Sequence, residues 1–199
     1  VVLIDRSIED AEKGKAYSEA LLDKAIKRKK STEDKKAKLL GLIKPSLDYA
    51  DLEGCALIIE AVFEDRGIKA DVTAKAEAVI PDTAVFGSNT STLPITGLAE
   101  ASSRPANFIG VHYFSPVDKM PLVEIIMGEQ TSDETLAKAL DYVGKIKKTP
   151  IVVNDSRGFY TSRVFATYVN EGIAMLKDGV TPAAIENVGK AAGMPVGPL

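Results

Sequence analysis

Apolar and polar positions come in blocks along the chain, and most blocks have the period of a strand or a helix. Residues 1–5 form a β-branched run that ends at an acid and predict a strand, whereas residues 8–30 space their apolar side chains by three and four and predict a helix. A near-continuous apolar run over 55–62 is typical of a strand buried on both faces. Residues 39–47 are only patchily apolar around Pro45.

Strand and helix continue to alternate towards the middle of the chain. Helices are predicted over 68–80 and 95–101, and strands over 83–87 and 107–112. Such alternation is typical of βαβ units, in which helices cover both faces of a mainly parallel sheet. The predicted fold class is therefore α/β with a Rossmann-like sheet.

The pattern changes after residue 112. A strand over 122–127 follows a proline-containing turn that is too short for a crossover helix, so this pair of strands is predicted to be antiparallel. A helix over 132–147, with Ser132 as its possible N-cap, leads to a last strand over 150–153.

A polar break at 154–158 marks the predicted domain boundary. It separates a Rossmann-like domain over 1–154 from the beginning of an all-helical domain over 155–199. Helices over 159–176 and 181–192 are predicted beyond the break, with no further strand.

Composition narrows the class of protein. Of the 199 residues 45% are hydrophobic, enough for a sizeable core, and a net charge of −3 gives no overall attraction to nucleic acid or to an anionic membrane. The single Cys55 excludes an internal disulfide and a CxxC metal or redox motif, and no apolar run is long enough to span a bilayer. We expect a cytoplasmic protein without a metal site.

Asp5, at the end of the first predicted strand, is a candidate nucleotide ligand. In dinucleotide-binding folds an acid that ends the second strand accepts hydrogen bonds from the adenosine ribose, although a merely solvated Asp5 would look the same. None of the 15 glycines lies two residues from another, so no GxGxxG loop is present. If Asp5 is the ribose acid, the first strand and its phosphate loop belong upstream of residue 1.

A basic segment over 24–38 contains eight Lys and Arg residues, among them Lys27 and Arg28, against two acids. Phosphate groups are natural partners for such a segment, and a solvated helix end is the alternative. After another predicted strand, residues 87–92 supply hydroxyls and an amide. These are either ligand groups or ordinary turn chemistry.

His112 and Glu124 form the most informative pair. His112 is the only histidine and ends a predicted strand, and Glu124 lies twelve residues later inside the apolar run of the antiparallel neighbour. An imidazole exchanges a proton near neutral pH, and a carboxylate in an apolar run needs a partner. The two predict an acid/base dyad, with a purely structural pair as the alternative.

Several ordered motifs resemble the 3-hydroxyacyl-CoA dehydrogenase family, and the likeness extends over essentially the whole chain. They are Val-Val-Leu-Ile-Asp, Ile-Glu-Ala-Val-Phe-Glu-Asp, Ser-Asn-Thr-Ser, Gly-Val-His-Tyr-Phe-Ser-Pro and Arg-Gly-Phe-Tyr-Thr-Ser-Arg, which begin at residues 1, 59, 88, 110 and 157. The chain looks most like the dehydrogenase portion of the multifunctional members of that family, which act in fatty-acid β-oxidation.

The resemblance implies a reaction and a cofactor. It makes His112 the catalytic acid/base, Glu124 the carboxylate that orients it, and Ser91 a ligand of the substrate hydroxyl. An L-3-hydroxyacyl-CoA would be oxidised to the 3-oxoacyl-CoA with NAD as the hydride acceptor. The implied cofactor contacts are Asp5, Val62, Phe63, Glu64, Lys69, Ser91 and Ser115, and the implied substrate contacts are Ser91, Ser162, Lys27 and Arg28.

Some departures from the family leave alternatives open. Ser115 and Ser162 stand where most relatives have Asn, and the glycine loop and most of the helical domain are absent from these residues. A catalytically silent CoA-ester-binding or assembly module is the main alternative, and a dehydrogenase of small β-hydroxy acids is another. We expect an acyl-CoA substrate, and a homo-oligomer or membership of a fatty-acid oxidation complex.

Overall fold

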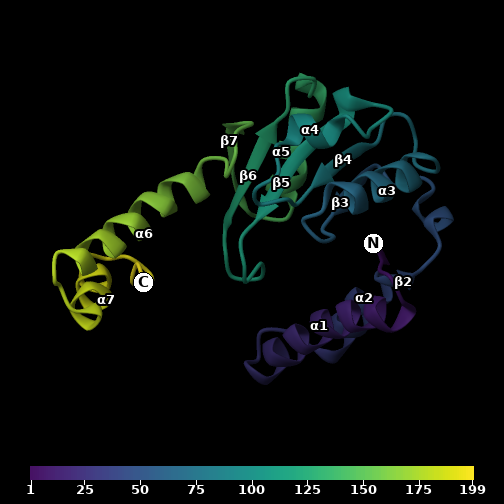
Figure 1. Cartoon of the computed structure of the whole chain (residues 1–199). Coiled ribbons are helices and arrows are strands. Elements are labelled where there is room, and N and C mark those ends of the chain that lie inside the picture. The colour runs from purple at the N-terminus through teal and green to yellow at the C-terminus, as the bar shows by residue number, and fades with distance from the viewer. The chain divides into compact units, whose positions relative to one another are not determined.

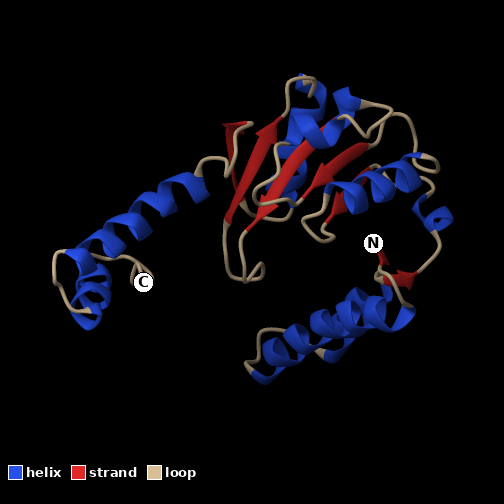
Figure 2. Ribbon diagram, in the orientation of Figure 1, coloured by secondary structure: helices blue, strands red, loops and turns tan.

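The computed structural model describes residues 1–199, which fall into two compact units (Figures 1 and 2). The first unit contains residues 1–58 and 71–84, and the second contains residues 59–70 and 85–199. Helix α3, Arg66–Glu77, runs from the second unit into the first.

The first unit has a small parallel sheet, in which β1, Val2–Ile4, pairs with β2, Lys44–Ser46. Two helices connect these strands: α1, Ile8–Lys27, and α2, Glu33–Gly41. The side chains of Ser7 and Thr32 cap them by accepting hydrogen bonds from the N–H groups of Asp10 and Lys35. A short 3-10 helix, η1, Tyr49–Leu52, follows β2.

The patchily apolar segment around Pro45 contains the end of α2 and strand β2, which the sequence pattern did not define. Six of the nine residues of α2 are charged or alanine and none is buried, so its apolar period is weak. Proline is unusual in strands, but a three-residue strand paired on one side tolerates a residue without an N–H.

The second sheet has five strands in the order β3-β4-β5-β6-β7. Their bounds are Leu57–Glu60, Val85–Ser88, Phe108–Tyr113, Leu122–Met127 and Thr149–Asn154. The pairs β4–β5 and β6–β7 are parallel and β5–β6 is antiparallel, as predicted. The Rossmann-like, mainly parallel sheet is confirmed. Strand β3, predicted to be buried on both faces, is instead an edge strand with three half-buried apolar residues.

Helices pack on opposite faces of β5. A Cβ on Gly110 would lie 2.8 Å from Ile95, which begins α4, Ile95–Ala99, and 2.8 Å from the Cβ of Ile126 on β6, so α4 covers this face of β5 where glycine leaves room. The hydroxyl of Tyr113 lies 3.3 Å from that of Tyr142 on α5, Asp133–Lys145. Residues 110 and 113 point to opposite faces because side chains alternate along a strand. His112 shares the face of Gly110.

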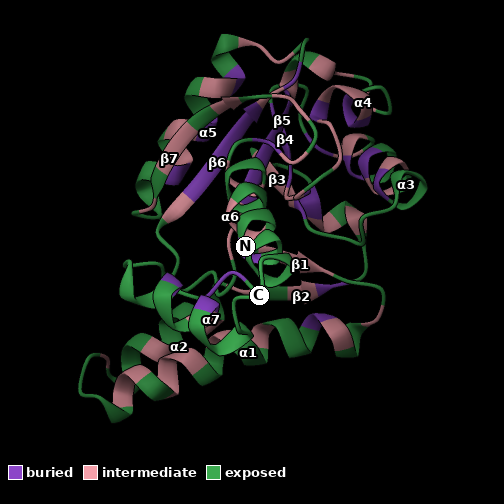
Figure 3. Ribbon diagram, turned by 60° about the vertical axis from the view of Figure 1, so that its left-hand side comes forward, coloured by how far each residue is buried: buried purple, intermediate pink, exposed green.

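Two helices follow the sheet: α6, Thr161–Lys177, and α7, Pro182–Ala191. Thr181 caps α7, and Pro182 occupies its first turn. Figure 3 shows β5 and β6 buried over most of their length, whereas α6 and α7 are mainly exposed. The predicted helical segment after residue 158 is therefore present, while the boundary at residue 154 stays a prediction.

Candidate active site

The register of β5 and β6 places His112 directly opposite Glu124. The imidazole Nδ1 lies 2.8 Å from Glu124 Oε2, and the two residues are only 7% and 0% exposed. In an antiparallel pair, residues in register point to the same face, so the alternation of side chains and the short connection are enough to bring them together. The catalytic role of the pair stays a prediction.

Each of the two carboxylate oxygens of Glu124 accepts two hydrogen bonds. Oε2 accepts hydrogen bonds from His112 and from the Thr161 hydroxyl, each 2.8 Å long. Oε1 accepts the backbone N–H of Thr161 at 2.8 Å and that of Tyr160 at 3.1 Å. Burial acts to raise the pKa of Glu124, but the bonds from His112 and Thr161 outweigh it and lower this pKa below its ordinary value. Glu124 is therefore an anion at neutral pH.

A strained turn aims the start of α6 at this carboxylate. Gly158 and Phe159 both have a positive φ, 76° and 48°, and Phe159 is a buried residue that rarely adopts this conformation. The turn directs the N–H groups of residues 160 and 161 towards Glu124. The first turn of a helix carries unpaired N–H groups and a partial positive charge, which favour an anion at this place.

The surroundings of His112 determine which ring nitrogen is available. An ionised Glu124 only accepts, so Nδ1 carries the proton of the shared hydrogen bond, and in the neutral ring the lone pair is therefore on Nε2. The rings of Phe114 and Phe159 lie 4.5 Å and 6.1 Å from the imidazole, centroid to centroid. His112 can therefore accept a proton on Nε2 while Glu124 stabilises the resulting cation.

A second polar group lies at the carboxyl ends of β3 and β4. Glu64 Oε1 accepts the N–H of Ser91 at 2.7 Å, the Ser91 hydroxyl at 3.1 Å and the Thr90 hydroxyl at 3.0 Å. Burial acts to raise the pKa of Glu64, but the bonds from Ser91 and Thr90 lower it overall. Two predicted site residues, Glu64 and Ser91, are therefore in direct contact. Ligands of doubly wound sheets bind at this end of the strands.

Lys69, a predicted cofactor contact, lies in a buried ion pair. Its ammonium is 2.8 Å from Glu60 Oε1 and 3.4 Å from Glu64 Oε2. Glu60 also accepts the Ser88 hydroxyl and the N–H of Val62, each at 2.7 Å. We did not predict a role for Glu60, although a carboxylate within an apolar strand was the same signal that drew attention to Glu124.

The remaining predicted residues of the second unit lie on loops or on α6. Val62 and Phe63 are 36% and 67% exposed at the end of β3, and Ser115 is exposed in the loop after β5. Ser162 is half-buried in the first turn of α6, next to Thr161. Thr161 itself was not predicted, because a lone Thr in a helix-forming segment carries no signal.

Three predicted residues lie in the first unit. Asp5 follows β1 and accepts the N–H of Arg6 at 2.7 Å, with an exposed carboxylate. Lys27 and Arg28 end α1 with exposed side chains. Lys36, from the same basic segment, is instead bound to Asp23 and Glu19, and these bonds raise its pKa. Lys27 and Arg28 at the end of α1 thus remain exposed to a ligand, as do Lys35 and Lys38 on α2.

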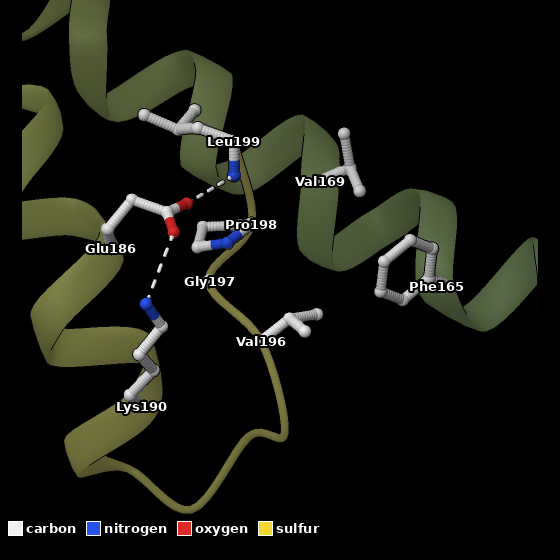
Figure 4. A pocket seen from close by; sticks show the side chains of 8 residues that line it. All are labelled: Phe165, Val169, Glu186, Lys190, Val196, Gly197, Pro198 and Leu199. Carbon is white, nitrogen blue, oxygen red and sulfur yellow. Dashed lines mark hydrogen bonds and ion pairs between the residues drawn. The ribbon is translucent and has the colours of Figure 1, made fainter.

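One cavity lies away from these residues. It has a volume of about 470 Å³ and is lined by α6, α7 and the last residues of the chain, among them Phe165, Val196 and the ion-paired Glu186 and Lys190 (Figure 4). None of the predicted site residues lines it. No group of three or more His, Cys, Asp or Glu side chains could hold a metal, and no helix is long and apolar enough to cross a membrane.

Comparison with known proteins identifies the family. Residues 1–156 match the family model described as 3-hydroxyacyl-CoA dehydrogenase, NAD binding domain, and residues 158–199 match the corresponding C-terminal domain. The chain belongs to the 3-hydroxyacyl-CoA dehydrogenase family. The predicted family is thereby confirmed. At the level of the family, the match also confirms an NAD-binding domain and the class of NAD-dependent dehydrogenases.

Individual relatives are similar over nearly all of the chain. It is 44% identical over 186 residues to the fatty acid oxidation complex subunit alpha of Shewanella amazonensis, a match that covers 92% of this chain and 26% of that protein. The (S)-3-hydroxybutyryl-CoA dehydrogenase of Ralstonia eutropha is 38% identical with a TM-score of 0.96, covering 100% of this chain and 71% of that one. The 3-hydroxybutyryl-CoA dehydrogenase of Escherichia coli is 29% identical with a TM-score of 0.95, covering 100% and 43%. The chain thus spans about a quarter of the length of the curated relatives it matches.

Proposed function

We propose that this chain carries the acid/base site of an NAD-dependent dehydrogenase that oxidises L-3-hydroxyacyl-CoA to 3-oxoacyl-CoA in fatty-acid β-oxidation. The observation that carries the proposal is the buried His112–Glu124 pair, with Nε2 as the free position of the ring. A relative named as a fatty acid oxidation complex subunit, and two structures named as 3-hydroxybutyryl-CoA dehydrogenases, support this class of substrate.

In the proposed reaction His112 Nε2 accepts the proton of the C3 hydroxyl, while the hydrogen on C3 leaves as a hydride with both electrons of the C3–H bond. The carbonyl forms as these two bonds break, so the proton ends on His112. Bound NAD would supply the acceptor for the hydride. Glu124 stays ionised and stabilises the imidazolium until the proton passes to solvent. The Ser91 hydroxyl would bind the substrate oxygen and orient it.

The polar and apolar groups at the ends of β3 and β4 fit a dinucleotide. Exposed Val62 and Phe63 offer an apolar surface, and the Glu64 carboxylate with Ser91 offers partners for hydroxyl groups. Ser115 follows the carboxyl end of β5, as Ser91 follows the carboxyl end of β4. Lys69 would act through Glu64, because its ammonium is buried between two carboxylates. We assign Asp5 to the adenosine ribose in the same proposal.

The substrate contacts extend beyond the reacting carbon. Ser162 would contact the substrate near C3, and the exposed Lys27 and Arg28 would bind phosphate groups of coenzyme A. The protein would act as a homo-oligomer or as part of a fatty-acid oxidation complex. Its cytoplasmic location stays a prediction. A silent CoA-ester-binding or assembly module is the second candidate, favoured by the absence of a GxGxxG loop within these residues.

The test is NADH oxidation with acetoacetyl-CoA by the full product of the gene that encodes this chain. His112→Ala should lower turnover by roughly 10²- to 10⁴-fold, because no side chain then exchanges the proton with the oxygen on C3. Binding of NADH, followed by its fluorescence, should change little. Turnover close to that of the unmodified protein would overturn the role of His112, and absence of turnover in the unmodified protein would favour the silent module.

A further inference from the structure

A hydroxyl group outside the predicted site completes the environment of the dyad. The Thr161 hydroxyl donates to Glu124 Oε2, the same oxygen that accepts from His112, and both bonds are 2.8 Å long. The Thr161 N–H donates to Oε1, also at 2.8 Å. One residue therefore binds both oxygens of the carboxylate and fixes its rotation.

The other groups around Glu124 cannot replace this hydroxyl. Its cross-strand neighbour on β7 is the apolar Ile151, and its neighbour on β5 is His112. It receives two backbone N–H groups, from the N-cap residue Tyr160 and from Thr161 of α6, both on Oε1. A charged His112 ring also lowers the pKa of Glu124, in addition to its hydrogen bond. Without the hydroxyl, Oε2 would have the imidazole as its only donor.

We infer that Thr161 is a positioning residue for the acid/base pair, which it tunes by holding Glu124 Oε2 against Nδ1 of His112. The inference rests on the proposed function, because it gives His112 the proton-transfer role. Thr161 is the first residue of α6, so the hydroxyl also ties the start of this 17-residue helix to the dyad. Displacement of the first turn of α6 would weaken three of the four hydrogen bonds on Glu124.

The experiment replaces the hydroxyl by a methyl group of similar size in Thr161→Val. A carboxylate that loses a hydrogen bond to its charged form is easier to protonate, so the Glu124 titration midpoint should rise by roughly one pH unit. Carbon-13 NMR of the 199-residue chain measures this midpoint, and the Glu124 signal is identified as the one missing from Glu124→Gln. Thr161→Ser, which keeps the hydroxyl, should titrate like the unmodified chain.

A second readout separates positioning from packing. His112 is the only histidine, so its two nitrogen-15 shifts report the ring tautomer without ambiguity. In the unmodified chain Nδ1 should carry the proton, and Thr161→Val should increase the Nε2-protonated form, whereas Thr161→Ser should not. Thr161→Ala serves in the same way if the valine variant does not fold.

The outcomes distinguish the inference from the proposed function. An unchanged Glu124 midpoint and tautomer in Thr161→Val would overturn the inference, even if His112→Ala abolishes turnover. A shift of the Glu124 midpoint and the His112 tautomer in Thr161→Val, together with normal turnover in His112→Ala, would support the positioning contact. It would overturn the acid/base role of His112, and with it the functional meaning of that contact.

Discussion

Two buried carboxylates of the same sheet, Glu124 and Glu60, are held in nearly the same way but differ in what they can do. Each accepts a bond of 2.8 Å from a titratable partner, one hydroxyl bond and at least one backbone N–H. The partner of Glu124 is an imidazole, which has a second ring nitrogen on which a proton can be exchanged, and that of Glu60 is the ammonium of Lys69, which only donates hydrogen bonds. Burial and hydrogen bonding are therefore common to both carboxylates, and the proposed proton transfer at Glu124 depends on its partner.

If Glu60 is mainly structural, its removal should affect stability most. The Lys69 side chain is only 3% exposed, and Glu60→Ala removes its nearer carboxylate and leaves Glu64 at 3.4 Å. The free energy of unfolding should therefore fall by about 3–5 kcal/mol. Urea denaturation measures this loss. Adding Lys69→Met should recover part of it, and Glu12→Ala, at an exposed site, should change it by less than about 0.5 kcal/mol. A loss below about 1 kcal/mol for Glu60→Ala would remove the contrast.

If Glu124 serves the reaction, its replacement should affect turnover. Glu124→Gln keeps the shape of the side chain but leaves the imidazolium without an anion, so kcat of the full gene product should fall roughly 10- to 100-fold. Glu60→Gln should instead raise the KM for NADH more than it lowers kcat, because Glu60 supports the loop of Val62 and Glu64. Steady-state kinetics with both substrates varied measures the split, and equal patterns in the two variants would contradict the distinction.

The smallest effect is on the pH dependence of stability. The pKa of Glu124 is lower in the folded protein than its ordinary value of 4.5, so its contribution is fully present above that value and is lost as the pH falls through the folded pKa. The difference in unfolding free energy between the unmodified chain and Glu124→Gln should therefore narrow on acidification, by on the order of 1 kcal/mol. Urea denaturation between pH 7 and pH 3 measures it. The contribution of Glu64 is common to both proteins and cancels, so a constant difference would mean that Glu124 is not held as an anion.

The dyad was predictable because its geometry is local. A short turn between two apolar strands makes them antiparallel, and the alternation of side chains then places His112 opposite Glu124. The same kind of periodicity predicted β5, β6 and α5 within one or two residues at each end.

The rest of the site depends on contacts between distant segments. Glu64 meets Ser91 across 27 residues, and Thr161 meets Glu124 across 37. No periodicity in the sequence encodes such a meeting, and a threonine is common in every kind of segment. Glu60 is a different case, because its position inside an apolar strand was a usable signal.

The four hydrogen bonds on Glu124 span very different lengths of chain, and we expect this difference to order their formation during folding. The β5–β6 hairpin brings His112 to Glu124 over 12 residues of chain, but the other donors arrive only when residues 160 and 161 have closed a loop of more than 35 residues. Closing the larger loop costs more chain entropy, so the hairpin contact forms at the lower entropic cost. All four donors surround Glu124 only after the polypeptide has joined both segments, so we expect a partly folded chain to hold His112 beside a carboxylate that lacks its other three hydrogen bonds.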